Sequence, residues 1–595
     1  MKGPPQEAPR HASLVEALAA AARSEHGATF VALSEREEKL SWTELHMRAR
    51  RKAAALRRLA VLPGDRVALI LRTGPLFLES FFAVLYAGAI PVPLYPPVRL
   101  GRLDDYHRAT AAMLKRVSAR LCLSEGFLAR LLGKSVAEAR PPLGLHLAGS
   151  LDGTDELQHP ASPEALALIQ FSSGSTVDPK PVGLTHRQLT AHIAALTQLG
   201  SATARDVYVT WLPLYHDMGL IGALLTTIAY PGPMVLIPPE AFLARPAIWL
   251  RALSRHRGTI SAAPNFAYAL CLRRVSEEQM VGVDLSAWRV AACGAEMVSG
   301  EVMRRFAERF ARCGFRGEAL LPVYGLSEAS LAVTFSPARP SPRSMIVDGP
   351  SLSNGLVRPI ERSEVAPKAR EVVSVGSPIP GVQVELRDEA GAPVPDRTVG
   401  QIFVKSPALM QGYFGEPDAT AAAVREGWLD TGDLGFVDAG ELFIAGRAKD
   451  LVIIRGANHP PQEFEDCLAG LEGLRPGCAV ALGFVPLGAD SGDPGGEELL
   501  ILAEHAGDEA PRGDPVARIR NAILDRTGLQ AHTVELLPPG TLPRTSSGKM
   551  RRREALRRFL ANELEPPKPV NAMRLIGELA ASTLALARAG LDRGD

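Results

Sequence analysis

The feature that most constrains the fold is a pair of short apolar segments separated by one helix-like segment. Residues 66–71 read RVALIL, residues 76–87 read LFLESFFAVLYA, and residues 89–94 read AIPVPL after Gly88. Two buried strands joined by one helix form a βαβ unit, in which the strands lie parallel in one sheet. Further short apolar segments continue the pattern at 165–171, 207–214, 232–237 and 288–294. We therefore predict an α/β fold with parallel or mixed sheets.

The length of the chain requires more than one hydrophobic core. With 595 residues it exceeds the size at which single cores stop growing. A separate small pattern of strands, with one helix at 516–528, begins near residue 447. We predict a large N-terminal domain over 1–446, a small α+β domain over 447–570 and a helical tail over 571–595.

The charge balance and the cysteine pattern argue against several classes of protein. Lys and Arg total 66 and Asp and Glu total 65, so no excess of positive charge favours nucleic acid as a partner. The six cysteines are scattered without a CxxC pair, which is typical of free thiols in a reducing cytoplasm. Residues 1–10 lack the apolar core of a signal peptide, and no apolar run approaches the ~20 residues of a membrane span. We expect a soluble cytoplasmic protein.

A cluster of hydroxyl side chains follows the predicted strand at 165–171. Residues 172–180 read SSGSTVDPK, and a helix capped by Thr185 is predicted to follow. Ligands of open α/β sheets bind at the carboxyl ends of parallel strands, and hydroxyls, backbone N–H groups and a lysine suit phosphate oxygens. The stretch does not match the Walker motif, so in isolation it is more typical of an ordinary polar loop. Its candidate phosphate-binding residues are Ser172, Ser173, Gly174, Ser175, Thr176 and Lys180.

Six further motifs follow in order along the chain. They are YHDMG (215–219), GAE (294–296), YGLSE (324–328), WLDTGD (428–433), GRAKDL (446–451) and LPRTSSGKMRR (542–552). Together with 172–180, they make the chain resemble the adenylate-forming superfamily of acyl and aryl ligases over about residues 10–560. The fatty acyl-AMP ligase branch is resembled in particular by the stretches at 215–222, 261–271 and 453–465. In this context residues 172–180 are interpreted as a phosphate loop.

The resemblance implies a chemistry and assigns catalytic residues to it. Members of the superfamily use ATP and Mg²⁺ to convert a carboxylate into an acyl-adenylate, and their small C-terminal domain is mobile. By resemblance, Lys549 would bridge the reacting carboxylate and the α-phosphate, Glu328 would hold Mg²⁺, and His216 would act beside the acyl slot. Lys449 matches the pivot of the C-terminal domain. The alternatives for Lys549 and His216 are a solvated surface charge and an ordinary core or surface histidine.

The same resemblance places the remaining candidates around the nucleotide and the acyl chain. Tyr324 would stack on adenine, and Ser327 would touch the α-phosphate. Asp433 would bind the ribose hydroxyls, with Arg447 beside it. The other nucleotide-binding candidates are Gly294, Ala295, Glu296 and Gly325, and the substrate-binding candidates besides His216 are Met218, Ile221, Asn265, Phe266 and Leu326.

Two residues of the phosphate loop depart from the pattern of the superfamily. Val177 and Pro181 stand where superfamily members often carry glycine. Valine tolerates a positive φ poorly, and proline removes one N–H donor. We expect a stiffer loop that keeps its phosphate contacts.

An insertion bears on the group that accepts the acyl chain. Glu328 and Gly376 lie 48 residues apart, which is long for the superfamily, and the excess falls at about 340–372. Such an insertion marks the fatty acyl-AMP ligases, which load the phosphopantetheine arm of an acyl carrier protein, or of a carrier domain in a polyketide or nonribosomal peptide synthase. We predict such a ligase for a medium- or long-chain fatty acid. The alternatives are a fatty acyl-CoA ligase and a catalytically silent acyl- or nucleotide-binding protein.

Overall fold

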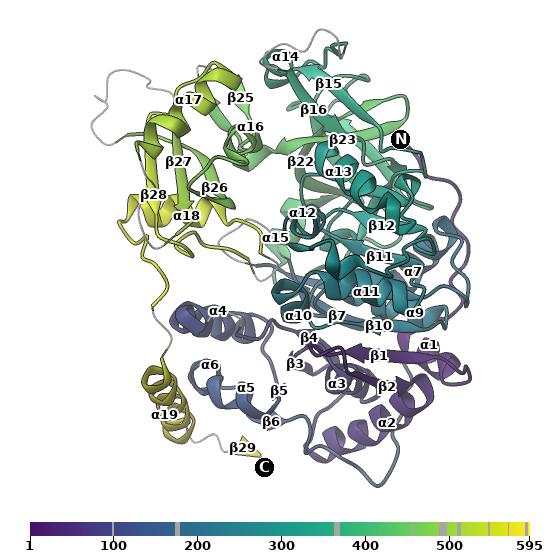
Figure 1. The fold of residues 1–595 in the computed structure, drawn as a ribbon. Coiled ribbons are helices and arrows are strands. Elements are labelled where there is room, and N and C mark those ends of the chain that lie inside the picture. The colour runs from purple at the N-terminus through teal and green to yellow at the C-terminus, as the bar shows by residue number, and fades with distance from the viewer. Residues whose placement is uncertain are drawn as a thin grey trace.

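The computed structural model has a mixed α/β architecture, which confirms the predicted fold class (Figure 1). A large N-terminal part contains sheets covered by helices, and a smaller C-terminal part lies beside it. The described residues are 1–97, 100–172, 179–361, 369–454, 457–486, 497–507, 513–545, 548–568, 571–589 and 593–594.

A nine-stranded sheet forms the centre of the N-terminal part. Its order is β17-β14-β13-β12-β11-β9-β10-β1-β2, in which the strands from β13 to β1 pair in parallel and the outer strands pair antiparallel. The predicted apolar segments at 207–214, 232–237 and 288–294 supply β9, β10 and β12. The strands are β1 (Gly27–Val31), β2 (Glu37–Ser41), β9 (Tyr208–Thr210), β10 (Met234–Leu236), β11 (Ile260–Ala263), β12 (Val290–Cys293), β13 (Leu320–Gly325), β14 (Ala332–Phe335) and β17 (Ser377–Pro378).

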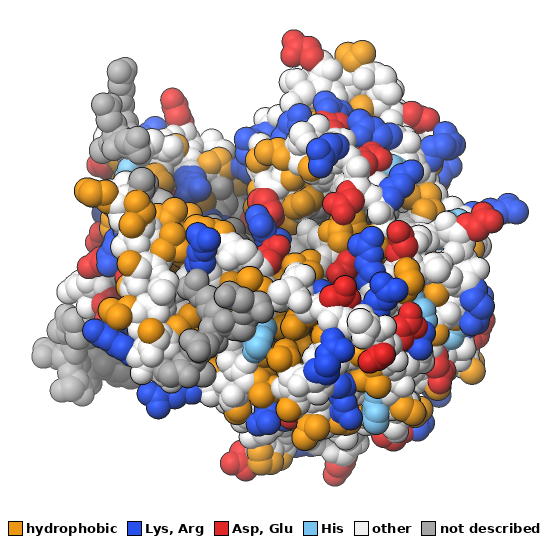
Figure 2. Space-filling model, turned by 90° about the horizontal axis from the view of Figure 1, so that it is seen from below, with side chains coloured by type: hydrophobic (Ala, Val, Ile, Leu, Met, Phe, Trp, Pro, Cys, Tyr) orange, Lys and Arg blue, Asp and Glu red, His pale blue; other side chains and the backbone are white. Residues whose placement is uncertain are grey.

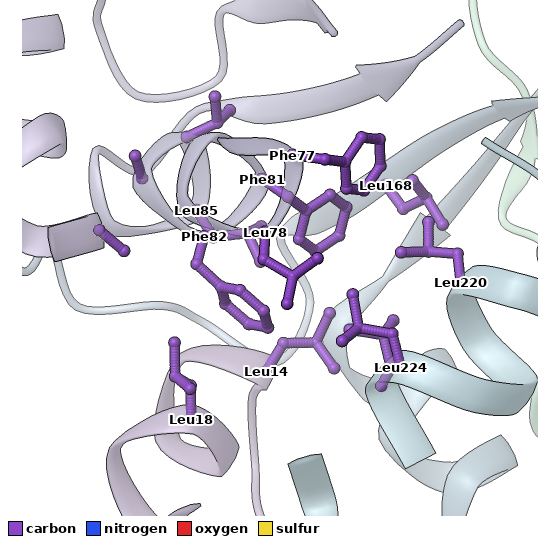
Figure 3. Packing of buried hydrophobic residues seen from close by; sticks show 14 of the residues in the cluster. Leu14, Leu18, Phe77, Leu78, Phe81, Phe82, Leu85, Leu168, Leu220 and Leu224 are labelled. Carbon is purple, nitrogen blue, oxygen red and sulfur yellow. The ribbon is translucent and has the colours of Figure 1, made fainter. Parts of the chain in front are cut away.

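The predicted βαβ unit is confirmed in a second sheet of order β29-β6-β5-β3-β4. β3 (Arg66–Ile70) and β4 (Ile90–Pro93) pair in parallel, and α3 (Pro75–Tyr86) connects them. Figure 3 shows how α3 packs on α1 (Leu14–Ala21) and on the π-helical segment Leu220–Leu225, through Phe77, Phe81, Phe82, Leu14, Leu220 and Leu224. Since the same buried cluster includes side chains of both sheets, it fixes one sheet against the other. The remaining strands are β5 (Leu121–Ser124), β6 (Leu145–Leu147) and β29 (Arg593–Gly594).

The strand predicted at 165–171 is present, but the prediction that it is a strand of a parallel sheet is wrong. β7 (Leu166–Phe171) pairs antiparallel with β8 (Pro181–Thr185), and β8 pairs with β20 (Gly412–Tyr413). Residues 172–180 therefore connect the two strands of a hairpin. Pro181 fits because proline is tolerated at the first residue of a strand. Thr185 then caps α7 (His186–Leu199) through a capping box with Gln188, as predicted.

The other elements of the N-terminal part cover these sheets or form a further one. That further sheet has the order β18-β19-β22-β21, and β23 also pairs with β22. Its strands are β18 (Gln383–Arg387), β19 (Gly400–Lys405), β21 (Val424–Arg425), β22 (Trp428–Asp438) and β23 (Glu441–Arg447). The helices are α2 (Trp42–Arg58), α4 (Leu103–Arg116), α5 (Gly126–Leu131), α6 (Gly133–Ala139), α8 (Asp217–Gly219), α9 (Thr226–Ala229), α10 (Pro239–Ala244), α11 (Ala247–Arg255), α12 (Asn265–Arg274), α13 (Gly300–Phe310) and α15 (Pro417–Ala423).

The C-terminal part is α+β and has hydrophobic clusters of its own. Ile519 and Ile523 of the predicted helix at 516–528 pack on Ile501 of the sheet β26-β27-β28. A short turn, Ala448–Asp450, connects this part to β23. Its strands are β24 (Val452–Ile454), β25 (Ala457–His459), β26 (Leu474–Phe484), β27 (Glu498–His505) and β28 (Thr533–Leu537), and its helices are α16 (Gln462–Glu465), α17 (Pro515–Thr527) and α18 (Arg552–Leu560).

The insertion at about 340–372 forms a small folded unit. β15 (Ser344–Asp348) and β16 (Ala369–Val373) pair antiparallel, and α14 (Gly349–Ser353) follows β15. Val347, Leu352 and Val372 of the insertion pack on Phe436 and Phe443 of β22 and β23. Residues 362–368 lie outside the described residues.

Charged side chains of both signs lie on the surface, and the cysteines lie inside. On the face seen in Figure 2, the basic and acidic side chains are interspersed. All six cysteines are buried free thiols. Within the described ranges, no helix combines the length and apolarity needed to cross a bilayer.

The last helix folds back onto the N-terminal part. α19 (Ala572–Arg588) packs on α5 and α6, at the lower left of Figure 1. Ser582 is fully buried, and its Oγ accepts a hydrogen bond from the Gly133 N–H at 2.7 Å. A β-carbon on Gly133 would lie 2.1 Å from the Ser582 carbonyl oxygen, so the two backbones touch. Lys134 and Glu578 form an ion pair at 2.6 Å beside this contact.

The substitution Ser582→Arg should release α19 from α5 and α6. A buried site in backbone contact with Gly133 has no room for a charged side chain, and an unpaired buried charge is costly. We expect limited proteolysis to cleave the tail of the variant well before that of the wild type. Leu584→Arg is the matched control, because Leu584 is 50% exposed on the same helix. Equal cleavage of the two variants would contradict the packing described here.

Candidate active site

A large cavity lies between the N-terminal and C-terminal parts. Its volume is about 2720 Å³, and its wall includes residues of both parts. The fold thus brings together motifs that are far apart in the chain. The predicted residues on this wall are Ser172, Lys180, His216, Met218, Asn265, Phe266, Ala295, Glu296, Tyr324, Gly325, Leu326, Ser327, Glu328, Asp433, Arg447, Lys449 and Lys549.

Six predicted residues are not placed on the cavity wall. Ile221 is fully buried in the hydrophobic core that Figure 3 shows in part. Gly294 lies under the wall, where a β-carbon would be 2.6 Å from Val323 Cγ2, so glycine is needed for close packing. The candidates that lie outside the described residues are Ser173, Gly174, Ser175 and Thr176 of the phosphate loop, and Val177 lies there with them.

One part of the site is a hydrogen-bonded chain of Tyr324, Asp433 and Arg447. β22 and β23 pair so that Asp433 lies opposite Arg447, and Arg447 Nε donates to Asp433 Oδ1 at 2.8 Å. The Tyr324 hydroxyl at the end of β13 donates to Asp433 Oδ2 at 2.7 Å. The carboxylate of Asp433 raises the pKa of Arg447, and burial raises the pKa of Tyr324. Arg447 is thus held protonated and Tyr324 neutral at neutral pH.

The two ends of the phosphate loop are held beside Glu328. Ser172 and Lys180 are joined by two hydrogen bonds, from Ser172 N to Lys180 O at 2.9 Å and from Lys180 N to Ser172 Oγ at 3.1 Å. The Lys180 ammonium lies 4.4 Å from the centre of the Tyr413 ring, a cation–π contact. The Tyr413 hydroxyl donates to Glu328 Oε1 at 3.0 Å, and burial raises the pKa of Glu328.

Glu328 has the chemistry of a Mg²⁺ ligand in a nucleotide site. Within the described ranges, no group of three or more His, Cys, Asp and Glu residues could hold a metal ion by itself. Mg²⁺ in such sites is bound through one or two carboxylates, with phosphate oxygens and water completing the octahedron. A single partly buried carboxylate beside a phosphate loop fits that ion when it enters together with a nucleotide.

A buried cluster of polar groups surrounds Asp217. His216 Nδ1 lies 2.6 Å from Asp217 Oδ1, and Ser327 Oγ donates to Asp217 Oδ2 at 2.6 Å. Burial by itself raises the pKa of Asp217, but His216, Ser327 and Lys549 together hold it well below its usual range. The other ring nitrogen, His216 Nε2, is buried without a hydrogen-bond partner in the part of the chain that the structure describes.

Lys549 enters the cavity from the C-terminal part. Its loop is closed by hydrogen bonds from Thr545 N to Lys549 O and from Lys549 N to Thr545 Oγ1, at 2.8 and 3.0 Å. Burial lowers the pKa of the Lys549 ammonium, while the carboxylates of Asp217, Glu296 and Asp433 raise it again. A lysine of the C-terminal part is therefore placed in the electrostatic field of carboxylates from the N-terminal part.

The apolar wall of the cavity is built around Phe266. The Phe266 N–H donates to Glu296 Oε1 at 2.6 Å, and Asn265 Oδ1 accepts from Ser299 N at 3.1 Å, which fixes the start of α12. Trp211 packs edge-on against Phe266 with ring centres 5.9 Å apart. Ala295 has φ of 68°, a left-handed conformation that turns the chain between β12 and Glu296. Aromatic and aliphatic walls of this kind suit an acyl chain.

Sequence reasoning missed three residues of this wall. Asp217 lies inside the YHDMG motif, and its position after a histidine was a usable signal. Tyr413 and Trp211 carried no local signal, because only the pairing of β20 with β8 and the packing of α12 bring them to the cavity.

Comparison with known proteins supports the resemblance that the motifs suggested. Residues 18–414 match the family described as "AMP-binding enzyme". A Caulobacter vibrioides protein with the provisional name acyl-CoA synthetase is 35% identical over 92% of this chain and 95% of its own. A medium-chain fatty acid–acyl carrier protein ligase of Moorena producens is 34% identical over 88% and 90%. A solved structure from work on fatty acyl-adenylate ligases of E. coli and L. pneumophila has a TM-score of 0.84 and 35% identity, covering 94% of this chain and 99% of its own.

The buried histidine behind the YGLSE motif should make the fold sensitive to acid. His192 of α7 accepts a hydrogen bond from Ala332 N at 3.1 Å, and burial lowers its pKa to about 4. Between pH 6.5 and 4 the unfolded chain binds a proton that the folded chain does not, so stability falls as pH falls through this window. The loss due to His192 is about 2 kcal/mol at pH 5.

Thermal midpoints at pH 7, 6 and 5 test this expectation. The midpoint of His192→Gln should fall less between pH 7 and 5 than that of the wild type, because glutamine does not titrate. Identical pH dependence in the two proteins would contradict the assignment.

Proposed function

We propose that this chain, which belongs to the AMP-binding enzyme family, is a fatty acyl-AMP ligase. Its family and relatives make it an adenylate-forming ligase of the fatty acyl-AMP and acyl-CoA type. In the proposal, ATP activates a medium- or long-chain fatty acid, and the acyl group is then loaded onto an acyl carrier protein or a carrier domain. The observation that favours an acyl-AMP ligase over an acyl-CoA ligase is a contact between the insertion and the C-terminal part.

The proposed first half-reaction needs the groups that meet in the cavity. A carboxylate oxygen of the fatty acid forms a bond to the α-phosphorus of ATP, the bond from that phosphorus to the bridging oxygen breaks, and pyrophosphate leaves. Negative charge is spread over the phosphoryl oxygens in the transition state, so catalysis is mostly positioning and electrostatic stabilisation. Lys549 would supply the positive charge at the reacting atoms. Mg²⁺, when bound at Glu328, would neutralise phosphate charge.

The nucleotide and the acyl chain would occupy opposite parts of the cavity. We place the ribose at Asp433 with Arg447 beside it, adenine along Tyr324, Ala295 and Glu296 with Gly294 behind, and phosphates at the loop 172–180. The fatty acid would lie along Met218, Asn265, Phe266 and Leu326, with its carboxylate near His216. Cytoplasmic action is part of the proposal, and the buried free thiols are compatible with it.

The insertion supports an acyl-AMP ligase over an acyl-CoA ligase. Arg370 Nη1 of β16 lies 3.7 Å from Glu463 Oε2 of α16, and α14 contacts β25. Both contacts join the insertion to the C-terminal part. We propose that they restrain the rotation that coenzyme A transfer requires, so that the adenylate waits for a docked carrier protein. The alternative, an acyl-CoA ligase, has the name of the Caulobacter relative in its favour.

We also propose the domain limits 1–446, 447–570 and 571–595, with Lys449 as the pivot. Lys449 lies exposed in the turn Ala448–Asp450, and its carbonyl accepts a hydrogen bond from Arg553 Nη2 at 3.2 Å. A few backbone dihedrals at such a turn can absorb a domain rotation.

Removal of the Lys549 ammonium should impair adenylate formation selectively. We expect Lys549→Ala to lower fatty-acid-dependent pyrophosphate exchange by about 10² to 10³, the usual cost of one electrostatic donor, while ATP still binds. Lys115→Ala is the control, because Lys115 is an exposed residue of α4 that pairs with Glu138. Near-normal exchange by Lys549→Ala would refute the assignment, and no exchange by the wild type would favour the silent protein.

Acceptor choice tests the role of the insertion. The enzyme is incubated with ATP, Mg²⁺ and a labelled fatty acid, and then coenzyme A or a phosphopantetheinylated carrier protein is added. We expect acyl-AMP to accumulate, coenzyme A to yield little thioester and the carrier protein to be loaded. Arg370→Ala should raise thioester formation with coenzyme A, because it removes the ion pair with Glu463. Arg358→Ala, an exposed residue of the same insertion, is the control.

Rapid acyl-CoA formation by the wild type would overturn the proposal in favour of the acyl-CoA ligase. If acceptor preference is unchanged in Arg370→Ala, the acyl-AMP ligase assignment stands. Only the proposed restraint of the rotation by the ion pair is then rejected.

A further inference from the structure

We propose that Asp217 is a positioning residue that aligns His216 and Ser327 beside the reacting carboxylate. This inference rests on the proposed adenylation reaction and adds a residue to it. Asp217 is 6% exposed, begins α8 and lies on the wall of the cavity. Its side chain joins the YHDMG and YGLSE motifs through His216 and Ser327.

The two oxygens of Asp217 are shared among fixed donors. Oδ1 faces His216 Nδ1 at 2.6 Å and accepts the Met218 N–H at 2.7 Å, and Oδ2 accepts the Ser327 hydroxyl at 2.6 Å. A carboxylate that receives only donors is stabilised in its charged form. Asp217 is therefore an acceptor on both oxygens, and most of its acceptor capacity is used by the protein.

The contact with Asp217 fixes the tautomer and the orientation of the His216 ring. With a proton held on Nδ1 toward the carboxylate, the imidazole ring has one orientation and its Nε2 faces away from Asp217. Nε2 is buried with no hydrogen-bond partner in the described part of the chain, and His216 lines the cavity. In this orientation Nε2 is left for a polar group of a bound substrate. The orphaned nitrogen is thus assigned to the substrate, and Asp217 aims it.

The contact with Ser327 changes the expected role of that hydroxyl. Its proton is donated to Asp217 Oδ2, so the hydroxyl has no proton left for a phosphate oxygen while this bond persists. The remaining lone pairs of Ser327 can accept from an ammonium or a water. We infer that Ser327 braces Asp217 and presents an acceptor, in place of the α-phosphate contact expected from the motif.

The third group that Asp217 acts on is Lys549. Asp217, Glu296 and Asp433 raise the pKa of this buried ammonium, whereas Arg447 and burial lower it. Asp217 itself is faced by His216, Ser327 and Lys549, and its charge also acts on His192 and Glu328. Loss of the Asp217 charge would thus make Lys549 lose its proton at a lower pH. Its effect on Lys549 requires no direct hydrogen bond.

The variant Asp217→Asn tests all three effects. The amide keeps the size of the side chain, but its NH₂ group must face one of the donors, either Ser327 or His216. We expect kcat for fatty-acid-dependent adenylation to fall about 10- to 100-fold, the range found when groups that orient metal ligands are removed. KM for the fatty acid should rise while KM for ATP stays within a factor of about two, and the alkaline limb of the pH–rate profile should move to lower pH.

Asp206→Asn is the matched control. Asp206 accepts hydrogen bonds from Arg289 and Thr259 but does not line the cavity. A purely structural role for Asp217 would lower the thermal midpoint of its variant, as in the control, and leave both the pH limb and the ratio of KM values unchanged. That outcome would overturn the inference. Absence of exchange in the wild type would instead refute the proposed function itself.

A second measurement decides the case in which Asp217→Asn does not fold. His216→Gln and Ser327→Ala each remove one donor to Asp217, and the two donors contact different oxygens of that carboxylate. If both act through Asp217, the double variant should lose less activity than the product of the single losses. Strict multiplicativity of the two losses would contradict a shared positioning residue.

Discussion

The arrangement of the site depends on one half-buried positive charge. Lys549 belongs to the C-terminal part, whereas the carboxylates that raise its pKa, those of Asp217, Glu296 and Asp433, come from three separate segments of the N-terminal part. Burial of an ammonium is unfavourable unless opposite charges compensate it. These carboxylates therefore favour the pose in which the C-terminal part places Lys549 in the cavity.

The other contacts between the two parts are individually weak. Arg102 donates to the carbonyl oxygens of Gly540, Thr541 and Glu565, and Arg558 pairs with Asp105 at 3.1 Å. Partly exposed pairs of this kind typically contribute less than about 1 kcal/mol each. The docked pose is held by small contributions around the charge of Lys549. The C-terminal part can therefore leave this pose without disrupting a hydrophobic core. This suits a domain that must adopt a second pose for transfer, as the proposed function requires.

Local sequence patterns predicted the parts of the fold that depend on local pairing. The βαβ unit at 66–94 was readable because its strands and helix are consecutive and their apolar runs have lengths typical of each element. The hairpin of β7 and β8 was missed because Pro181 obscured the start of a strand whose partner β20 is more than 200 residues away. Site residues, too, were predictable where they lie in local motifs and not where distant pairing places them. Most of the described motif residues reached the cavity wall, whereas Tyr413 is brought to Glu328 only by that distant pairing.

The tail limits how far the C-terminal part can move from this pose. The part is attached at Ala448–Asp450 on one side and, through residues 561–571, at α19 on the other. Eleven extended residues could span at most about 40 Å, but the connection is not free along its length. Lys568 N donates to Gly101 O at 3.2 Å, and Arg102 holds Glu565 O at 2.9 Å, so the segment is bound to α4 and the turn before it. The rotation about Lys449 that we propose would therefore have to release these contacts, even while α19 stays on α5 and α6.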